Sequence, residues 1–466
     1  MKCNNSAEII HGCCLDVMGG MKDESVDAIV TDPPYGLNFM GKGWDRGVPG
    51  VAYWREALRL LRPGGHLVGF GGARTYHRLA CSIEDAGFEI RDQIMWIYGS
   101  GFPKSMDVSK QMDRMARRDY VAAAVSAGVK IPGNSYHDWT KGNHSPSDAW
   151  WQKFVEALGA DQVSAIERKV LEIYPRSAGW FASKGSCSVT RPQSNLAQEW
   201  EGWGTALKPA HEPIVLARKP IDESVAICVM RHGTGAINVD GCRIKTEKKE
   251  NSTRAGEQSE HSTYAESGAT NFSLKPGPRG GSQHGRWPAN VCVGEDAARE
   301  IDEQSGVLKS GASPAMRKSS KFQNTFGEFS GKGRPDYIRE KSQGGASRFF
   351  YCAKASRKER NAGMEGCAEM PLNWSSGDQS PGTFQSDGTH KFAQNYHPTV
   401  KPIALMRWLC RLVAPPGALI LDPFCGSGST ILAAMDEGLN SIGIEKDAGY
   451  AEIAKRRVVS ASARLF

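Results

Sequence analysis

Apolar residues in the first hundred positions fall into blocks that predict strands alternating with helices. The run at 26–30 is short and apolar and ends at two prolines, as expected of a buried strand that closes at a turn. From Val51 to Leu61 apolar residues recur at helical spacing, and Pro-Gly-Gly at 63–65 ends the predicted helix. Residues 7–30 predict a strand, a turn and a strand, and further elements follow at 66–72, 74–86 and 88–98. The alternation predicts an α/β fold with a parallel, doubly wound sheet.

The same alternation returns in the last fifty residues. A strand at 419–422 runs into the glycine-rich turn Asp-Pro-Phe-Cys-Gly-Ser-Gly, which opens a helix at 430–437. The next strand, 441–444, ends in Glu445, 19 residues beyond Gly426. A strand, a glycine-rich turn, a helix and an acid about twenty residues on is the pattern of a ribose-binding unit. Its glycines let the backbone approach a ligand, and Glu445 can accept hydrogen bonds from two ribose hydroxyls. No Gly-x-x-x-x-Gly-Lys phosphate loop is present, which disfavours an NTPase.

The middle of the chain departs from this pattern. Residues 107–128 and 147–174 have helical composition and predict a helical insertion over 105–205, after which an apolar strand within 206–245 returns the chain to the sheet. Residues 245–285 are poor in apolar residues and rich in Ser, Gly, Glu and Lys, so they predict a mobile loop. We therefore divide the chain into a first core half, the insertion, the return, a mobile basic region and a second core half: 1–104, 105–205, 206–245, 246–345 and 346–466.

Composition and charge narrow the class of protein. The chain has 466 residues and a net charge of +7, no apolar run long enough to span a membrane, and twelve cysteines without paired CxxC spacing. Because the N-terminus also lacks the apolar core of a signal peptide, we expect reduced thiols and an intracellular protein. The segment 309–360 holds thirteen Lys and Arg against four acids, with aromatics interleaved. Such a segment fits a surface that contacts DNA phosphates, although a solvated loop without a partner remains open.

Candidate chemistry gathers at Asp32-Pro33-Pro34-Tyr35, directly after the strand at 26–30. The prolines stiffen this loop at the carboxyl end of a strand, where open α/β sheets bind ligands. An exocyclic base amine is a poor nucleophile because its lone pair is delocalised into the ring. Two acceptors on its hydrogens, the Asp32 carboxylate and the Pro33 carbonyl, would localise that lone pair. Tyr35 offers a face on which an extruded base can stack.

Asp-Pro-Pro-Tyr followed 390 residues later by Asp-Pro-Phe-x-Gly-x-Gly resembles the β group of DNA amino-methyltransferases. The resemblance implies a Rossmann-like methyltransferase sheet with circularly permuted motif order and a large inserted target-recognition region. It implies S-adenosyl-L-methionine as cofactor and Asp32, Pro33, Pro34 and Tyr35 as catalytic residues. It also implies a set of cofactor-binding residues: Asp16, Thr399, Lys401, Asp422, Phe424, Gly426, Gly428 and Glu445.

The activity implied is site-specific methyl transfer to the exocyclic N6 of adenine in double-stranded DNA after base flipping. The related N4-cytosine enzymes more often carry Ser in place of Asp32, so adenine is favoured and cytosine stays open. A C5-cytosine enzyme is disfavoured because the chain has no Pro-Cys dipeptide. A non-catalytic DNA-binding regulator on the same scaffold, and methylation of RNA or of a side-chain amide, also stay open. No metal or membrane is needed, and the cytoplasm of a bacterial or phage-infected cell is the expected location. A homodimer and a cognate restriction endonuclease are further partners left open.

Overall fold

The structure is a computed structural model that describes most of the core and part of each insertion. The described residues are 6–37, 45–99, 105–109, 111–112, 195–244, 285–310, 323–324, 327–328, 342–353, 357–365, 367, 370–371 and 392–465. The chain divides into two compact units, the first made of residues 1–100 and 210–466 and the second of residues 101–209. Most of the predicted insertion 105–205 and of the predicted basic region 246–345 lies outside the described residues, so their roles stay predictions.

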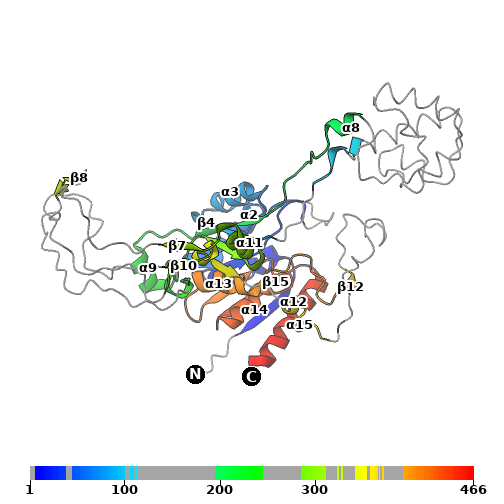
Figure 1. Ribbon diagram of the computed structural model, residues 1–466. Helices are drawn as coiled ribbons and strands as arrows, with labels where there is room; N and C mark the ends of the chain where they lie inside the picture. Colours follow the sequence, from blue (N-terminus) through cyan, green and yellow to red (C-terminus); the bar gives the residue numbers. More distant parts are fainter. Residues whose placement is uncertain are drawn as a thin grey trace, which may run out of the picture. The chain divides into compact units, whose positions relative to one another are not determined.

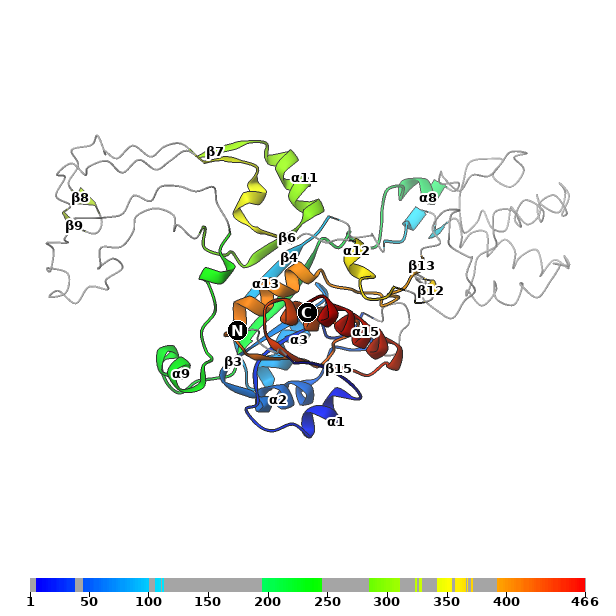
Figure 2. The same cartoon turned by 90° about the horizontal axis from the view of Figure 1, so that it is seen from below.

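The first unit is built on a nine-stranded sheet (Figures 1 and 2). Only β5 runs antiparallel to its neighbours, β3 and β4, and every other pairing in the sheet is parallel. The predicted α/β class is thus confirmed, with one strand reversed in a mostly parallel sheet. The strands in spatial order are β1 (Ala7–His11), β15 (Asn440–Glu445), β14 (Leu419–Asp422), β2 (Val26–Thr31), β3 (Leu61–Phe70), β5 (His211–Arg218), β4 (Glu89–Ile97), β6 (Val291–Gly294) and β11 (Tyr351–Ala353).

Helices cover both faces of the sheet, because successive strand residues point to opposite sides. Val30 and Phe70 pack with Leu405 and Leu409 on one face, whereas Ile29 packs with residues of the opposite face. The helices of the first face are α13 (Ile403–Val413), α14 (Ser429–Asp436) and α15 (Ala448–Leu465) (Figure 2). Those of the second face are α1 (Cys14–Gly19), α2 (Val51–Leu60) and α3 (Tyr76–Asp85). The sheet is therefore wound on both sides, as the alternation of elements predicts.

The described residues of the two units also form smaller elements. In the first unit these are α9 (Val225–His232), η3 (Asp240–Cys242), α11 (Glu295–Ser305), η4 (Ala346–Phe349), α12 (Arg357–Arg360) and three short antiparallel pairs. The pairs are β7 (Leu308–Ser310) with β10 (Ser342–Gly344), β8 (Gln323–Asn324) with β9 (Gly327–Glu328), and β12 (Met370–Pro371) with β13 (Phe392–Ala393). In the second unit, the described residues form α8 (Asn195–Glu199) and a bridge between Asp107 and Gly204. None of the helices described is long and apolar enough to cross a membrane.

Two local predictions differ from the structure. The turn predicted within residues 7–30 contains the short helix α1, which buries Cys14 and Met18 against the core. The Pro-Gly-Gly at 63–65 lies inside β3, where pairing with β2 jumps from Val26–Leu61 to Ala28–His66. Gly64 has a φ of +74°, and a Cβ on Gly65 would lie 2.9 Å from the carbonyl of Asp27. The glycines therefore allow a bulge in the strand, and the helix before it ends at Leu60.

Asp27 connects the two halves of the permuted chain at the amino ends of their strands. Its side chain, 10% exposed, accepts a hydrogen bond of 2.7 Å from the Leu419 amide at the start of β14 and pairs with Arg62 at 2.9 Å. The carboxylate thus joins β2 to a strand 392 residues away and to the bulge of β3.

Replacing Asp27 should therefore destabilise the fold. We expect Asp27→Ala to lower the free energy of unfolding by about 2 kcal/mol, because it leaves a strand amide and a guanidinium without their acceptor. The matched control is Asp23→Ala, whose side chain is 72% exposed and pairs with Arg59, and which should cost under about 1 kcal/mol. Denaturant unfolding measures both, and equal losses would contradict the role given to Asp27.

Candidate active site

Neighbouring strands β2, β14 and β15 each end beside a carboxylate. Asp32 follows β2, whereas Asp422 and Glu445 are the last residues of β14 and β15. Parallel strands bring their carboxyl ends to one edge of the sheet, which is where ligands bind in open α/β folds. Thr31 donates a hydrogen bond of 2.6 Å from its hydroxyl to Asp422, so the strand ends of the two motifs are joined directly. The structure thus places both sequence motifs at one edge.

Asp32 and three other polar side chains, those of Tyr35, Glu212 and Lys401, form a cluster. Lys401 donates to Asp32 Oδ2 at 2.6 Å, and its Nζ lies 3.2 Å from Glu212 Oε2 and 3.1 Å from the Tyr35 hydroxyl oxygen. The Tyr35 hydroxyl lies 2.8 Å from Asp32 Oδ1 and 2.8 Å from Glu212 Oε2. These residues come from the loop after β2, the start of β5 and the segment before α13. The cluster is therefore assembled from three distant parts of the sequence.

Burial makes the charges of this cluster strongly interdependent. The Lys401 side chain is 7% exposed, and burial alone would lower its pKa, but Asp32 and Glu212 raise that pKa above its usual value. Burial, followed by the same two carboxylates, raises the pKa of Tyr35 well above its usual range. The ammonium also lies 5.3 Å from the Tyr35 ring centre and 4.9 Å from that of Phe70. Lys401 is thus a fixed cation, and the Tyr35 hydroxyl keeps its proton at neutral pH.

The loop that carries Asp32 and Tyr35 is held from outside. The Thr75 hydroxyl donates to the Tyr35 carbonyl at 2.6 Å, and the buried Asp45 accepts from the amides of Gly36 and Leu37 at 2.7 and 3.2 Å. Gly36 has a φ of +67°, and a Cβ there would lie 2.9 Å from the backbone of Gly47. These contacts and the two prolines fix the direction of the Tyr35 side chain before any ligand binds.

The glycine-rich loop between β14 and α14 is bound to Glu445. Gly426 donates its amide to Glu445 Oε2 and Asp447 donates its amide to Oε1, both at 2.8 Å. Gly428 has a φ of +80° and precedes the first turn of α14. A carboxylate has about four acceptor positions, so the amides of Gly426 and Asp447, one on each oxygen, orient Glu445 and leave acceptor positions for hydroxyl donors. This is the arrangement that a ribose requires.

Asp422 lies beneath this loop and is 2% exposed. Burial raises the pKa of Asp422 to about 7, against hydrogen bonds from Thr31, Thr430 and the Phe424 amide that lower it. Its carboxyl group accepts from Thr31 and, at 3.1 Å, from the amide of Phe424, so it shapes the start of the loop. Phe424 itself packs against Tyr53 and Trp54, with ring centres 5.9 and 6.3 Å apart.

Three residues predicted to bind the cofactor, Lys401, Thr399 and Asp16, lie outside the glycine-rich loop. Lys401, predicted for the cofactor pocket, contacts Asp32 and Glu212. Thr399 is exposed, and its amide donates to His397 Nδ1 at 3.4 Å. Asp16 is exposed on α1, whereas Gly12 is the residue of that segment whose amide bonds the Glu445 carbonyl, at 2.9 Å. Cofactor contacts of these three side chains remain predictions.

Sequence reasoning did not single out two residues that the structure places at the site, Glu212 and His397. Glu212 stands at the start of a strand, where the sequence shows no partner for it. His397 Nε2 would lie 2.6 Å from a Cβ on Gly426, and its ring meets Tyr450 edge-on with centres 4.5 Å apart. Burial, followed by the charge of Lys401, lowers the pKa of His397 to about 3. The neutral ring therefore covers the glycine loop, and only the His-Pro pair in the sequence hints at it.

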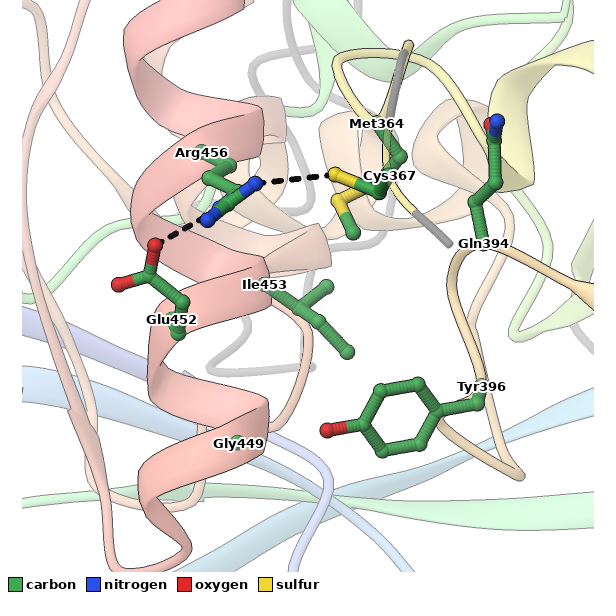
Figure 3. Close-up of a pocket in the computed structure, with 8 residues that line it drawn as sticks. All are labelled: Met364, Cys367, Gln394, Tyr396, Gly449, Glu452, Ile453 and Arg456. Carbon is green, nitrogen blue, oxygen red and sulfur yellow. Dashed lines mark hydrogen bonds and ion pairs between the residues drawn. The ribbon is translucent and has the colours of Figure 1, made fainter. Parts of the chain in front are cut away.

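A separate pocket lies against the outer side of α15 (Figure 3). It is lined by Tyr396 and Gln394 from the segment before α13, by Met364 and Cys367, and by residues of the helix itself. Arg456 donates to Glu452 at 2.7 Å and to the Cys367 sulfur at 3.1 Å, closing one side of it. None of the residues of the Asp32 cluster lines this pocket. Among the described residues, no group of His, Cys, Asp and Glu is placed to hold a metal ion.

Comparison with known proteins identifies the family. A family model described as DNA methylase, of the N6/N4 type, matches residues 26–456. The chain belongs to this DNA methylase family. Family members use S-adenosylmethionine as methyl donor, so the predicted cofactor is confirmed.

Individual relatives match over shorter segments. The type II methyltransferase M.HindIII of Haemophilus influenzae is 43% identical over 65 residues, which cover 14% of this chain and 21% of that protein. The type II methyltransferase M2.MboI of Moraxella bovis is 40% identical over 70 residues, 15% of this chain and 26% of that protein. The chain thus aligns with only about a fifth to a quarter of these relatives.

Solved structures of methyltransferases align along nearly the whole chain, but weakly. The M1.HpyAVI complex with S-adenosylmethionine covers 97% of this chain and 98% of its own, at 14% identity and a TM-score of 0.33. The cytosine-N4-specific PvuII DNA methyltransferase covers 99% of this chain and 93% of its own, at 12% identity and a TM-score of 0.38. Both TM-scores lie below 0.5, so neither likeness supports a conclusion about this chain.

The glycine loop and Glu445 fit the donor of this family. The oriented carboxylate suits the two ribose hydroxyls, and the glycines at 426 and 428 keep the backbone free of Cβ atoms. Glu445, at the end of β15, also places a carboxylate beside the loop, which suits a sulfonium cation. The residues present therefore fit the cofactor.

Adding a side chain to Gly426 tests this fit. We expect Gly426→Ala to weaken equilibrium binding of S-adenosylmethionine by roughly 10-fold or more, since the Cβ meets His397 at 2.6 Å and φ is +51°. Gly19→Ala is the control, because a Cβ there has nothing within 4 Å. Calorimetric titration measures both variants, and unchanged binding in Gly426→Ala would place the cofactor elsewhere.

The pKa of Asp422 predicts a pH dependence of stability. Since its folded pKa is about 7 and its usual value 3.8, the stability it contributes is fully present below pH 3.8 and is lost as pH rises to about 7. The difference in unfolding free energy between the wild type and Asp422→Asn should therefore shift against the wild type over that range, by up to about 1.4 kcal/mol per pH unit, and level off above it. A difference that is flat from pH 4 to 7 in denaturant unfolding would contradict the burial argument.

Proposed function

We propose that this chain transfers a methyl group from S-adenosylmethionine to the exocyclic N6 of adenine in double-stranded DNA, after the base is flipped out of the helix. The observation that carries the proposal is the Thr31–Asp422 hydrogen bond of 2.6 Å, which joins the strand before Asp32 to the strand before the glycine loop. The groups suited to the acceptor amine and to the methyl donor are thereby held on adjacent strands.

The residues of the catalytic loop suit an amine nucleophile. Asp32 and the Pro33 carbonyl accept the two hydrogens of the amine, which favours a pyramidal nitrogen with its lone pair directed at the donor. The Tyr35 hydroxyl is held by hydrogen bonds, so the ring is fixed and offers its face to a flipped base. The bound cofactor supplies an electrophilic methyl group on a sulfonium, and the protein contributes positioning in a site of low dielectric.

The assignment of adenine rests on Asp32. The related N4-cytosine enzymes more often carry Ser at that position. The Asp32 carboxylate of this chain is a stronger acceptor for an amine hydrogen than a serine hydroxyl is. Methylation of cytosine N4 is the alternative outcome of the test below.

Described residues outside the sheet support binding to DNA. Arg286 and Arg348 lie over the Phe349 ring at 5.0 and 4.4 Å, and Arg243 lies over the Trp287 ring at 5.0 Å. Phe349 is 40% exposed and Trp287 67% exposed. The three arginines are half-buried, and the Arg243 side chain is 13% exposed, so they support the exposed rings from behind. Exposed aromatic rings held in this way suit stacking of splayed bases, and the positive charge beneath them suits nearby phosphates. We propose that this surface, together with the insertions 105–205 and 246–345, contributes to target recognition.

Cellular context completes the proposal. We propose the cytoplasm of a bacterial or phage-infected cell as the location, because the proposed substrate is double-stranded DNA. Since the matched relatives are named type II methyltransferases, we further propose a role in restriction and modification, with a homodimer and a cognate endonuclease as partners that stay predictions.

Expression in a host that lacks DNA methylation tests the function. We expect nucleoside mass spectrometry of its DNA to find N6-methyladenine with the wild type and none with Asp32→Ala, because the variant lacks the acceptor for the amine. Purified Asp32→Ala should bind S-adenosylmethionine within about 3-fold of the wild type, since Asp32 lies outside the glycine loop.

Other results would revise the proposal in defined ways. N4-methylcytosine from the wild type would keep the enzyme class and reject adenine. Cofactor binding without any modified base would favour the non-catalytic regulator. Full activity of Asp32→Ala would reject the catalytic assignment.

A further inference from the structure

The hydroxyl of Tyr35 lies between two carboxylates. Its oxygen is 2.8 Å from Asp32 Oδ1 and 2.8 Å from Glu212 Oε2, while Lys401 Nζ is 3.1 Å away. The three oxygens form a continuous chain of hydrogen-bond contacts. It leads from Asp32, which is proposed to bind the target amine, to Glu212, the second residue of β5. Each contact in this chain is at a normal hydrogen-bond distance for O–H···O.

The hydrogen-bond positions between Asp32, Tyr35 and Glu212 can hold one more proton than these groups carry. A phenol has one proton and can accept two hydrogen bonds, and Lys401 has three N–H donors. The three donors of Lys401 reach Asp32, Glu212 and Tyr35. When both carboxylates are ionised, the Tyr35 hydroxyl donates its one proton to one carboxylate. No proton then lies between the Tyr35 oxygen and the other carboxylate oxygen. One additional proton fills this gap with no movement of heavy atoms.

Methyl transfer generates such a proton. When the amine nitrogen forms its bond to the methyl carbon, the bond from that carbon to sulfur breaks and its electron pair stays on sulfur. The nitrogen, having given up its lone pair, carries a positive charge and must release one hydrogen as a proton. Asp32 is the group in contact with that hydrogen in the proposed function. The Asp32 side chain is 18% exposed, and a base bound to it would cover that part. The Glu212 side chain is 19% exposed and lies at the other end of the chain of contacts.

We propose that Glu212 is the terminal proton acceptor of the reaction, reached from Asp32 through the hydroxyl of Tyr35. The nitrogen gives its proton to Asp32 Oδ1, Asp32 passes a proton to the Tyr35 oxygen, and Tyr35 releases its own proton to Glu212 Oε2. The phenol is neutral before and after, and Lys401 stays an ammonium throughout. This role rests on the proposed function. The sequence alone does not indicate it, because Glu212 lies 177 positions from Tyr35.

Several other titratable groups face this chain of contacts. Tyr98, after β4, has a pKa raised to about 12 by burial and then by Glu212, so it stays protonated. His397 is neutral because burial and Lys401 lower its pKa to about 3. Asp422 faces Asp32 from β14, with a pKa of about 7. Among these neighbours, Asp422 has the pKa closest to neutral pH. The methylation rates of all variants are therefore compared at one pH, with Asp422 left unchanged.

A double-mutant cycle under single-turnover conditions tests the relay. Glu212→Gln keeps the shape and the acceptor for Tyr35 but takes up no proton, and Tyr35→Phe removes the hydroxyl and keeps the ring. We expect each to slow methyl transfer by roughly 10²-fold, and the double variant to be no slower than the slower single one, because both break the same path. Glu89→Gln is the matched control, since Glu89 lies at the other end of the β4–β5 pairing, with Arg218, and should leave the rate unchanged.

A second readout needs no activity. Removal of the Glu212 charge should lower the pKa of Tyr35. Tyrosinate absorbance is measured during a pH titration of the cofactor-free protein. The signal of Tyr35 in Glu212→Gln is the absorbance of that variant minus the absorbance of Glu212→Gln/Tyr35→Phe. Affinities for S-adenosylmethionine should stay within about 3-fold of the wild type in all variants.

The outcomes separate the relay from the function on which it rests. Independent, multiplicative losses in the cycle, or a full rate in Glu212→Gln, would overturn the relay while methylation by the wild type upholds the proposed function. A wild type that binds cofactor and methylates no DNA would overturn the proposed function instead. An unchanged Tyr35 titration in Glu212→Gln would contradict the contact itself.

Discussion

The pairing of β2 with β14 is the constraint on which the site depends. Ala28 and Ile29 pair with Ile420 and Leu421, and beyond these pairs the Thr31 hydroxyl donates to Asp422. Both strands are buried, so their register is fixed by core packing on both faces. The two motifs are 390 residues apart in the sequence, yet strand pairing brings them onto neighbouring strands. Their order along the chain does not change this arrangement.

The second determinant is the charge balance around Lys401. A buried ammonium is unfavourable alone, and here it is stabilised by Asp32 and Glu212 with their side chains under one-fifth exposed. The same contacts align Asp32 and keep the Tyr35 hydroxyl in line between two oxygens. One cluster thus positions the loop that carries Asp32 and Tyr35 and also provides the path of the proposed proton relay. Cofactor binding by Lys401 stays a prediction.

Local sequence predicts the elements and the two loops but not the contacts between them. Apolar runs and glycine turns are short-range signals, so β2, α2, β14 and Glu445 could be placed from them. The insertion of Pro-Gly-Gly into β3 could not, because the bulge depends on pairing with β2. Glu212 and His397 were missed for the same reason: their roles come from partners that only the folded sheet brings near, and neither stands at a recognisable spacing.

In the proposed function, donor and acceptor meet at the edge formed by β2, β14 and β15. A crystal structure with S-adenosylmethionine and a duplex containing the methylated sequence shows whether they do. We expect the ribose hydroxyls on Glu445, the flipped base on Tyr35 with its amine on Asp32, and the methyl carbon roughly 3–3.5 Å from that nitrogen. A cofactor bound away from the glycine loop, for example in the pocket beside α15, or a base whose amine does not reach Asp32, would contradict this expectation.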